Sequence, residues 1–219
     1  MFHFSDLLPY TDVFLKGLLT TVELAVISTL LGLILGAAFA AARQYGATWL
    51  SRLIAVYIEL IRNTPFIVQL FFIFFGLPSI GVKLSAWEAG VIAMVINLAA
   101  YSTEIIRAGL VATPKGQWEA GKVLGLSFRQ TLARVVMIPA IEKIYPALTS
   151  QCIIVMLGSA VLSQISVQDL TYAANLVQSR NFRSFESYFV TALLYLFLAI
   201  LMRKVFNIIG KRLFSYRVE

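Results

Sequence analysis

Residues 113–141, TPKGQWEAGKVLGLSFRQTLARVVMIPAI, are the one long polar, charge-bearing stretch among otherwise apolar segments. From Trp118 to Val136 the apolar residues recur at roughly helical spacing, with basic residues between them. Gly125 interrupts the pattern, and a glycine in a helix interior costs about 1 kcal/mol relative to alanine. We therefore predict two short helices that meet at a turn, where the missing side chain permits close approach of another backbone.

Two interpretations fit this amphipathic stretch. A kinked helix pair that projects from a membrane offers a docking surface to a partner protein. Alternatively, the stretch lies on the inner leaflet, attracted through its lysines and arginines. The pattern alone does not separate the two.

Composition places the chain among integral membrane proteins. Of its 219 residues, 59% are hydrophobic, and the mean hydropathy is +0.83. Only 13% are charged, about half the fraction of a soluble domain. The net charge of +7 would suggest nucleic-acid binding in a soluble protein, but here the basic residues are concentrated in particular segments between the apolar spans. With one cysteine, Cys152, and one histidine, His3, we expect no disulfide, no metal site and no catalytic residue.

The first apolar run, 17–42, is too long for a signal-peptide core and long enough to cross about 30 Å of hydrocarbon. Residues 1–16 before it are predicted to be a short external segment. Gly32 and Gly36 lie four residues apart on one face, which would let another helix pack closely, although lipid-facing glycines give the same pattern.

The predicted second span, 53–75, contains Glu59, Arg62, Asn63, Thr64 and Pro65. Charged residues at such depth cost about 3 kcal/mol each, so they should face the protein interior or water. Pro65 cannot donate a backbone hydrogen bond, which suggests a bend. A broken, polar helix suits a transport site. An ion pair between Glu59 and Arg62 near the cytoplasmic interface is the alternative.

Three further spans are predicted at 86–110, 145–167 and 187–209. In the first of these, Asn97, Tyr101 and Glu104 share one helical face, which lines a substrate path or only joins helices by hydrogen bonds. The span at 145–167 is too polar to face lipid on most sides, so it should be central. The polar segment 168–186 is long enough for a helix on the far surface, and 210–219 is a basic tail.

Lysines and arginines set the orientation. They concentrate in 43–52, in 107–143 and from residue 203 onward, whereas the other side holds only Lys16, Lys83, Arg180 and Arg183. By the positive-inside rule the N-terminus is outside, the C-terminus is inside, and the loop at about 111–141 is cytoplasmic.

Three motifs in order resemble the permeases of polar amino-acid ABC importers of the histidine, glutamine and glutamate type. LIRNTPFIVQL at 60–70 is similar to an arginine-glycine-threonine-proline motif, with Asn63 in place of the usual glycine. AAYSTEIIRAG at 99–109 is similar to the third span of that family, and PKGQWEAGKVLGLS at 114–127 to its EAA loop. The resemblance implies an all-α, polytopic membrane protein with five transmembrane helices and the type I ABC importer permease fold.

The resemblance also implies partners. Two permease subunits, identical or homologous, would enclose the pathway, and two copies of an ATP-binding ABC subunit would dock on their EAA loops. An external solute-binding protein would deliver the amino acid. The partner ATPase would bind ATP and Mg²⁺, because this sequence has no GxxxxGK[ST] phosphate loop and needs no cofactor of its own. The expected location is the bacterial cytoplasmic (inner) membrane, and no nucleic-acid partner is expected.

Carried over by motif, the coupling residues are Glu119, Ala120, Gly121 and Gly125. The expected pathway residues are Arg62, Thr64, Asn97, Tyr101, Glu104, Ser159, Ser163 and Gln164.

The sequence departs from the family at several positions. Gly121 is the third residue of the EAA triplet, and Pro139 comes one residue late after Gly125. Leu157 and Gly158 stand where relatives often carry two charges. If those charges bind substrate in relatives, this subunit binds less or accepts a different side chain.

Two other classes remain for comparison. A secondary transporter or channel for small polar solutes would share the polar-striped spans without needing a docking loop. A membrane enzyme would need a nucleophile-base or metal constellation, and the spans contain none.

Overall fold

The computed structural model describes residues 3–214, and this part of the chain is helical, without strands. The α-helices are α1 Thr11–Tyr45, α2 Thr48–Arg62, α3 Phe66–Phe71, α4 Leu77–Ser79, α5 Ala86–Val111, α6 Lys115–Val123, α7 Phe128–Thr131, α8 Met137–Gly158, α9 Leu170–Asn181 and α10 Ser184–Leu213. Two π-helical turns span Phe72–Gly76 and Leu132–Val136, and 3₁₀-helices span Phe4–Tyr10 and Ser159–Ile165.

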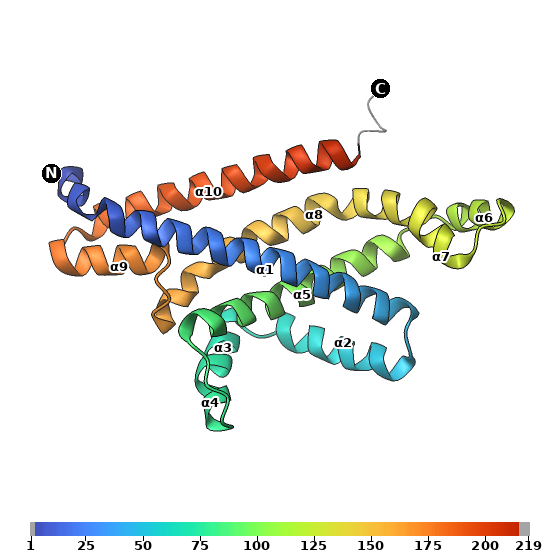
Figure 1. Ribbon diagram of the computed structural model, residues 1–219, viewed down its shortest axis with the longest axis horizontal. Coiled ribbons are helices and arrows are strands. Elements are labelled where there is room, and N and C mark those ends of the chain that lie inside the picture. Colours follow the sequence, from blue (N-terminus) through green and yellow to red (C-terminus); the bar gives the residue numbers. More distant parts are fainter. Residues whose placement is uncertain (1–2, 215–219) are drawn as a thin grey trace.

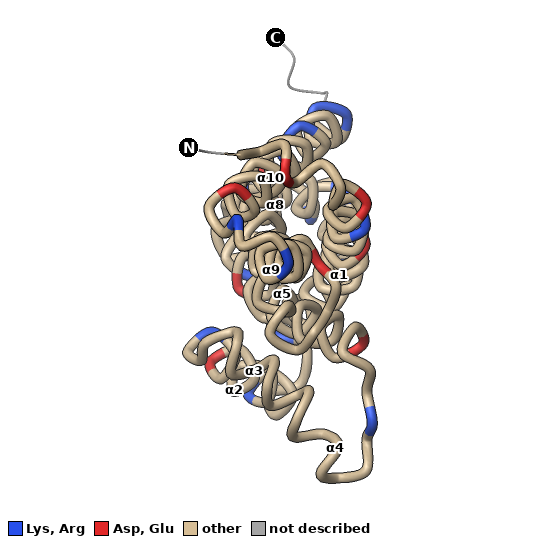
Figure 2. Tube along the Cα trace, turned by 90° about the vertical axis from the view of Figure 1, so that its left-hand side faces the viewer, with Lys and Arg blue, Asp and Glu red and all other residues tan. Residues whose placement is uncertain are grey.

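The long helices run side by side along the molecule (Figure 1). The N-terminus and α9 lie at one end, and α6 and α7 lie at the opposite end. Seen from the α9 end, α2, α3 and α4 lie on one side of the bundle that α1, α5, α8, α9 and α10 form (Figure 2). The predicted docking stretch is therefore a projection at one tip of the molecule.

Within residues 3–214, four helical stretches are long and apolar enough to cross a membrane: Phe4–Tyr45, Ala86–Val111, Phe128–Ile165 and Ser184–Leu213. The pair Thr48–Arg62 and Phe66–Ser79 makes a fifth span if this pair, bent by 111°, is one broken span. The all-α membrane-spanning class is confirmed, and the predicted five spans are obtained when the bent pair counts as one span. The helices extend beyond the predicted spans because hydropathy marks only the apolar part of a helix, whereas polar residues such as Lys16 continue the same backbone hydrogen bonds.

Helix α5 is the centre of the bundle, and α1 packs closely on it. Gly32 and Gly36 are buried in this contact, so of the two interpretations of their spacing the close helix contact is correct and the lipid-facing one is wrong. A Cβ at Gly36 would lie 1.9 Å from Ser102 Oγ and 2.9 Å from its Cβ. Within α5, Thr103 Oγ1 donates to Ala99 O over 2.6 Å and Ser102 Oγ to Leu98 O over 2.7 Å. The same two hydroxyls also lie 3.3 Å from the carbonyl oxygens of Gly36 and Gly32, respectively.

A larger side chain at Gly36 is expected to force α1 away from α5. Overpacking a helix contact costs about 1–3 kcal/mol, and Gly36→Val would also break the two hydroxyl contacts. We expect Gly36→Val to lower the thermal unfolding midpoint of the purified protein in detergent by several degrees. Ala37→Val is the matched control because Ala37 is exposed on the same helix, and it should leave the midpoint unchanged. Equal midpoints for the two variants would contradict the close contact.

The stretch at 111–141 is not a loop throughout. The second of its two helices begins at Phe128 and continues through the π turn Leu132–Val136 and α8 to Ile165, so the fourth span starts well before residue 145. Pro139 therefore lies inside a helix rather than ending one. The π turn before it contains an i−5 bond, from the Met137 N–H to the Leu132 carbonyl, and such a local change of bonding accommodates a proline.

The segment 168–186 forms helix α9, which packs against α1 and α10 at the N-terminal end of the bundle. Its residues Leu170, Ala173, Ala174 and Val177 are buried. The last five residues of the predicted basic tail, 215–219, lie outside the described residues; Gly210 to Leu213 continue α10.

Candidate functional site

The second span breaks at residues 63–65. Pro65 stands before the first residue of α3 in an extended conformation (φ −63°, ψ 139°). Side chains satisfy the last carbonyls of α2: Asn63 Nδ2 donates to Glu59 O over 2.9 Å, and Thr64 Oγ1 donates to Leu60 O over 2.7 Å. A break at membrane depth is tolerated only when freed backbone groups find such partners.

Gln69 joins this bend to α5. Its Nε2 donates to the carbonyl oxygens of Ile61 (2.7 Å) and Thr64 (3.0 Å), and its Oε1 accepts from Asn97 Nδ2 over 3.1 Å. The side chain is buried, with 8% of its surface exposed. Sequence reasoning missed Gln69, although an amide four residues after Pro65 in an apolar run was a signal.

A cavity of about 370 Å³ opens beside the bend. It is lined by Thr64 and Phe66 at the bend, Asn97 and Tyr101 of α5, and Gln151, Ile154, Val155 and Gly158 of α8. The polar groups in this lining are a hydroxyl, a phenol and two amides. Three of the expected pathway residues, Thr64, Asn97 and Tyr101, therefore meet at one cavity, together with Gln151, which the sequence did not single out.

Arg62 ends α2 beside this cavity. Its guanidinium carbon lies 5.4 Å from the centre of the Tyr101 ring, the geometry of a cation–π contact. The alternative ion pair with Glu59 does not form: Glu59 Oε2 accepts a hydrogen bond from Asn63 Nδ2 over 2.9 Å instead. None of the ion pairs found between residues 3 and 214 involves Arg62.

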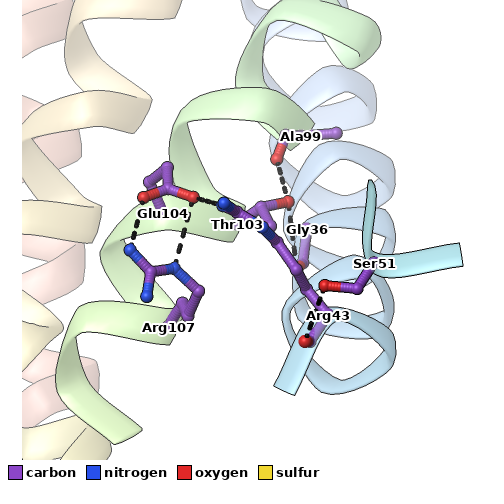
Figure 3. Close-up of polar contacts among 7 residues, drawn as sticks. All are labelled: Gly36, Arg43, Ser51, Ala99, Thr103, Glu104 and Arg107. Atoms are coloured by element: carbon purple, nitrogen blue, oxygen red, sulfur yellow. Dashed lines mark hydrogen bonds and ion pairs between the residues drawn. The ribbon is translucent and has the colours of Figure 1, made fainter. Parts of the chain in front are cut away.

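Glu104 does not line the cavity and instead belongs to an ion cluster (Figure 3). One carboxylate oxygen accepts from Arg43 Nη1 at the end of α1, and the other accepts from Arg107 Nη2 over 3.0 Å. Ser51 Oγ, near the start of α2, donates to the carbonyl oxygen of Arg43 over 3.1 Å. The cluster thus ties α1, α2 and α5 together.

The remaining expected pathway residues do not line the cavity. Ser159 is fully buried, Ser163 Oγ donates to the carbonyl oxygen of Ala160 over 2.9 Å, and Gln164 is exposed. All three lie on the 3₁₀-helix Ser159–Ile165, which continues α8 past the cavity wall at Gly158.

The predicted docking stretch forms two helices joined by a turn at Gly125. Gly125 adopts φ +67°, and its N–H donates to Lys122 O while the Leu126 N–H donates to Gly121 O, both over 3.0 Å. This left-handed cap satisfies the last carbonyls of α6. Ser127 and Gln130 then form a reciprocal cap that starts α7.

The tip of this helix pair presents apolar side chains to solvent. The exposed fractions of Val123 and Leu124 are 87% and 71%, and a Cβ at Gly125 would meet no atom within 4 Å. Glu119 and Ala120 are also exposed. Gly121 is the opposite case: it is buried, and a Cβ there would lie 2.3 Å from Thr131 Cγ2, so glycine at this position lets α6 contact α7.

Asp169, at the opposite end, is a buried acid that the sequence did not distinguish. It caps α9, accepting from the Tyr172 N–H over 2.8 Å and from the Tyr195 hydroxyl over 3.1 Å. No ion pair found in residues 3–214 involves it. Burial raises the pKa of Asp169 from 3.8 to about 6.

The raised pKa of Asp169 makes stability depend on pH. Between pH 4 and 6 the folded state holds a proton that the unfolded state releases, so folding stability falls as pH rises through this window, by about 2–3 kcal/mol for such a shift. Asp169→Asn keeps an acceptor for the Tyr172 N–H and should flatten this part of the stability profile, measured as thermal unfolding midpoints in detergent between pH 4 and 7.5. Asp12→Asn, at an exposed acid, should leave the profile unchanged. An unaltered profile for Asp169→Asn would contradict the assignment.

Comparison with known proteins assigns this chain to a family. Residues 28–215 match the family described as binding-protein-dependent transport system inner membrane component. The L-cystine transport system permease protein TcyB of Bacillus subtilis is 35% identical over 91% of this chain and 86% of its own length. The glutamine transport system permease protein GlnP of Escherichia coli is 31% identical over 97% of this chain and 98% of its own length.

Solved structures agree. An amino acid ABC transporter crystallised with histidines is 34% identical and matches with a TM-score of 0.89 over 97% of this chain and 99% of its own. The inward-facing MetNI methionine ABC transporter is 18% identical and matches with a TM-score of 0.75 over 94% of this chain and 98% of its own. At this identity the match supports the fold only.

The chain therefore belongs to the family of binding-protein-dependent transport system inner membrane components. It has the fold of type I ABC importer permeases, and the resemblance inferred from the motifs at 60–70, 99–109 and 114–127 is confirmed.

Proposed function

We propose that this chain is the membrane subunit of an ATP-driven importer of polar amino acids. The observation that carries the proposal is the cavity at the broken second span, where Thr64, Asn97, Tyr101 and Gln151 meet. Neutral polar groups at the break of a membrane helix suit a small polar solute. Relatives that share most of the chain are named for the transport of cystine and glutamine.

The coupling of transport to ATP would run through α6, the turn at Gly125 and α7. The exposed apolar tip at Val123 and Leu124 is a surface that a partner would cover. An ATPase that docks there would bind ATP and Mg²⁺, with two copies for two permease subunits, and an external solute-binding protein would deliver the amino acid. This arrangement requires the N-terminus outside and α6 in the cytoplasm, as the distribution of basic residues predicts.

The proposed location is the bacterial cytoplasmic membrane. A secondary transporter or channel for small polar solutes is the other class to be tested, and it would have no use for a projecting helix pair.

ATP-driven uptake tests the proposal. The chain is purified with its ATPase and permease partners, reconstituted into proteoliposomes and supplied with the solute-binding protein. Uptake of labelled polar amino acids should require ATP on the α6 side and should stop with a non-hydrolysable analogue. Uptake that is equally fast without ATP would overturn the proposal in favour of a secondary transporter or channel.

A further inference from the structure

We propose that the cavity beside the bend selects amino acids whose side chains carry no net charge. The inference rests on the proposed function, because it names the class of amino acid that the same site accepts.

The first argument is the chemistry of the cavity wall. Its polar groups belong to Thr64, Asn97, Tyr101 and Gln151, and the other lining side chains are apolar. A lysine or arginine side chain would enter this cavity without meeting a carboxylate. A ligand that fills the cavity displaces water from its wall, and a charge placed there is costly unless it is paired. The α-ammonium group is common to all amino acids, so a cationic side chain adds a second unpaired positive charge and is disfavoured.

The second argument concerns Gln151. This residue is half-buried on α8 and lines the cavity. Within the described range 3–214, the side chain of Gln151 takes part in no hydrogen bond, ion pair or ring contact. An amide that is partly removed from water gains free energy when a ligand supplies the missing partner. A neutral polar side chain, such as an amide or hydroxyl, supplies one.

The third argument concerns Arg62, a cation that lies beside this cavity through its contact with Tyr101. The guanidinium lies over the Tyr101 ring and takes part in none of the ion pairs of residues 3–214. It provides one positive charge for the α-carboxylate that every amino acid carries. A glutamate or aspartate side chain would bring a second carboxylate, and the described lining of the cavity contains no lysine or arginine to pair with it, so the cavity disfavours anionic side chains as well.

Binding without the solute-binding protein isolates the selectivity of this cavity. The complex of this chain with its partner permease and ATPase is placed in lipid nanodiscs, and labelled glutamine is displaced by unlabelled amino acids. We expect asparagine and serine to compete at least about tenfold better than lysine, arginine or glutamate. Gln151→Glu adds a carboxylate to the wall, and should improve competition by lysine and arginine about tenfold while weakening glutamine.

Two further variants control this experiment. Gln168→Glu makes the same change at an exposed glutamine outside the cavity, and should preserve the wild-type ranking. Gln151→Met removes the amide at similar size, and should weaken glutamine binding about tenfold even if Gln151→Glu fails to assemble.

Three results would overturn the inference: charged amino acids that compete as well as glutamine in the wild type, an unchanged ranking in an assembled Gln151→Glu complex, or no amino-acid binding by a complex that imports amino acids. ATP-independent uptake, or none by the complete system, would instead refute the proposed function.

Discussion

Replacement of Gly125 by glutamate is expected to reduce ATP-driven uptake to background and to prevent the ATPase from co-purifying with the chain. Gly125 adopts φ +67°, where a side chain costs about 1–2 kcal/mol, and its Cα faces open space at the tip of the helix pair. A glutamate would place a charged side chain on the surface where we propose that the ATPase docks. Co-purification, followed by the proteoliposome assay, measures both effects.

Gly81 supplies a matched control for this experiment. It also has a positive φ, +90°, and a Cβ there would meet no atom within 4 Å. Gly81→Glu therefore introduces the same charge and a similar strain at the turn before α5, and the ATPase should still co-purify. Gly125→Asn, whose side chain tolerates the left-handed conformation, should retain part of the uptake. Loss of the ATPase in both glutamate variants, or in neither, would contradict docking at Gly125.

Replacement of Glu104 by glutamine is expected to destabilise the protein rather than change its substrate. The variant leaves Arg43 and Arg107 side by side without the carboxylate that both contact. Breaking a buried ion pair costs about 3–5 kcal/mol, and because these side chains are 20–34% exposed we expect about 2–3 kcal/mol. The thermal unfolding midpoint in detergent measures the loss.

Two variants separate this stabilising role from a role in the substrate pathway. Glu23→Gln changes an exposed acid of α1 and should leave the midpoint unchanged. The double variant Glu104→Gln with Arg43→Gln removes one of the two repelling charges and should be more stable than Glu104→Gln alone. A wild-type midpoint combined with altered amino-acid uptake in Glu104→Gln would place Glu104 in the pathway instead.

The sequence predicted the features that depend on local chemistry. Apolar runs predicted the spans, Pro65 predicted the break, and the spacing of Gly32 and Gly36 predicted a close helix contact. Gly125 predicted the turn between two helices because glycine readily adopts the left-handed conformation that ends α6.

Features that depend on tertiary contacts could not be predicted in this way. Asn97, Tyr101 and Glu104 share one face of α5, but only the packing of α1 brings Arg43 to Glu104 and leaves the other two beside the cavity. Likewise, the burial of Asp169 follows from how α9 packs, because its sequence context is polar. Hydropathy also placed the start of the fourth span too late, because the helix that begins at Phe128 starts with basic, solvent-exposed residues.

The continuous helical run from Phe128 to Ile165, which includes the π turn Leu132–Val136 and Pro146, would have a mechanical consequence if it moves as one body. It begins beside the turn at Gly125 and carries Gln151 and Gly158 of the cavity wall, so one rod connects the two places. At 1.5 Å per residue the rod from Phe128 to Gly158 is about 45 Å long, and a tilt of about 10° about its midpoint would move each end by about 4 Å in opposite directions. A displacement at the Gly125 end of this helical run would therefore move the cavity wall at the other end, without any change in the side chains between them.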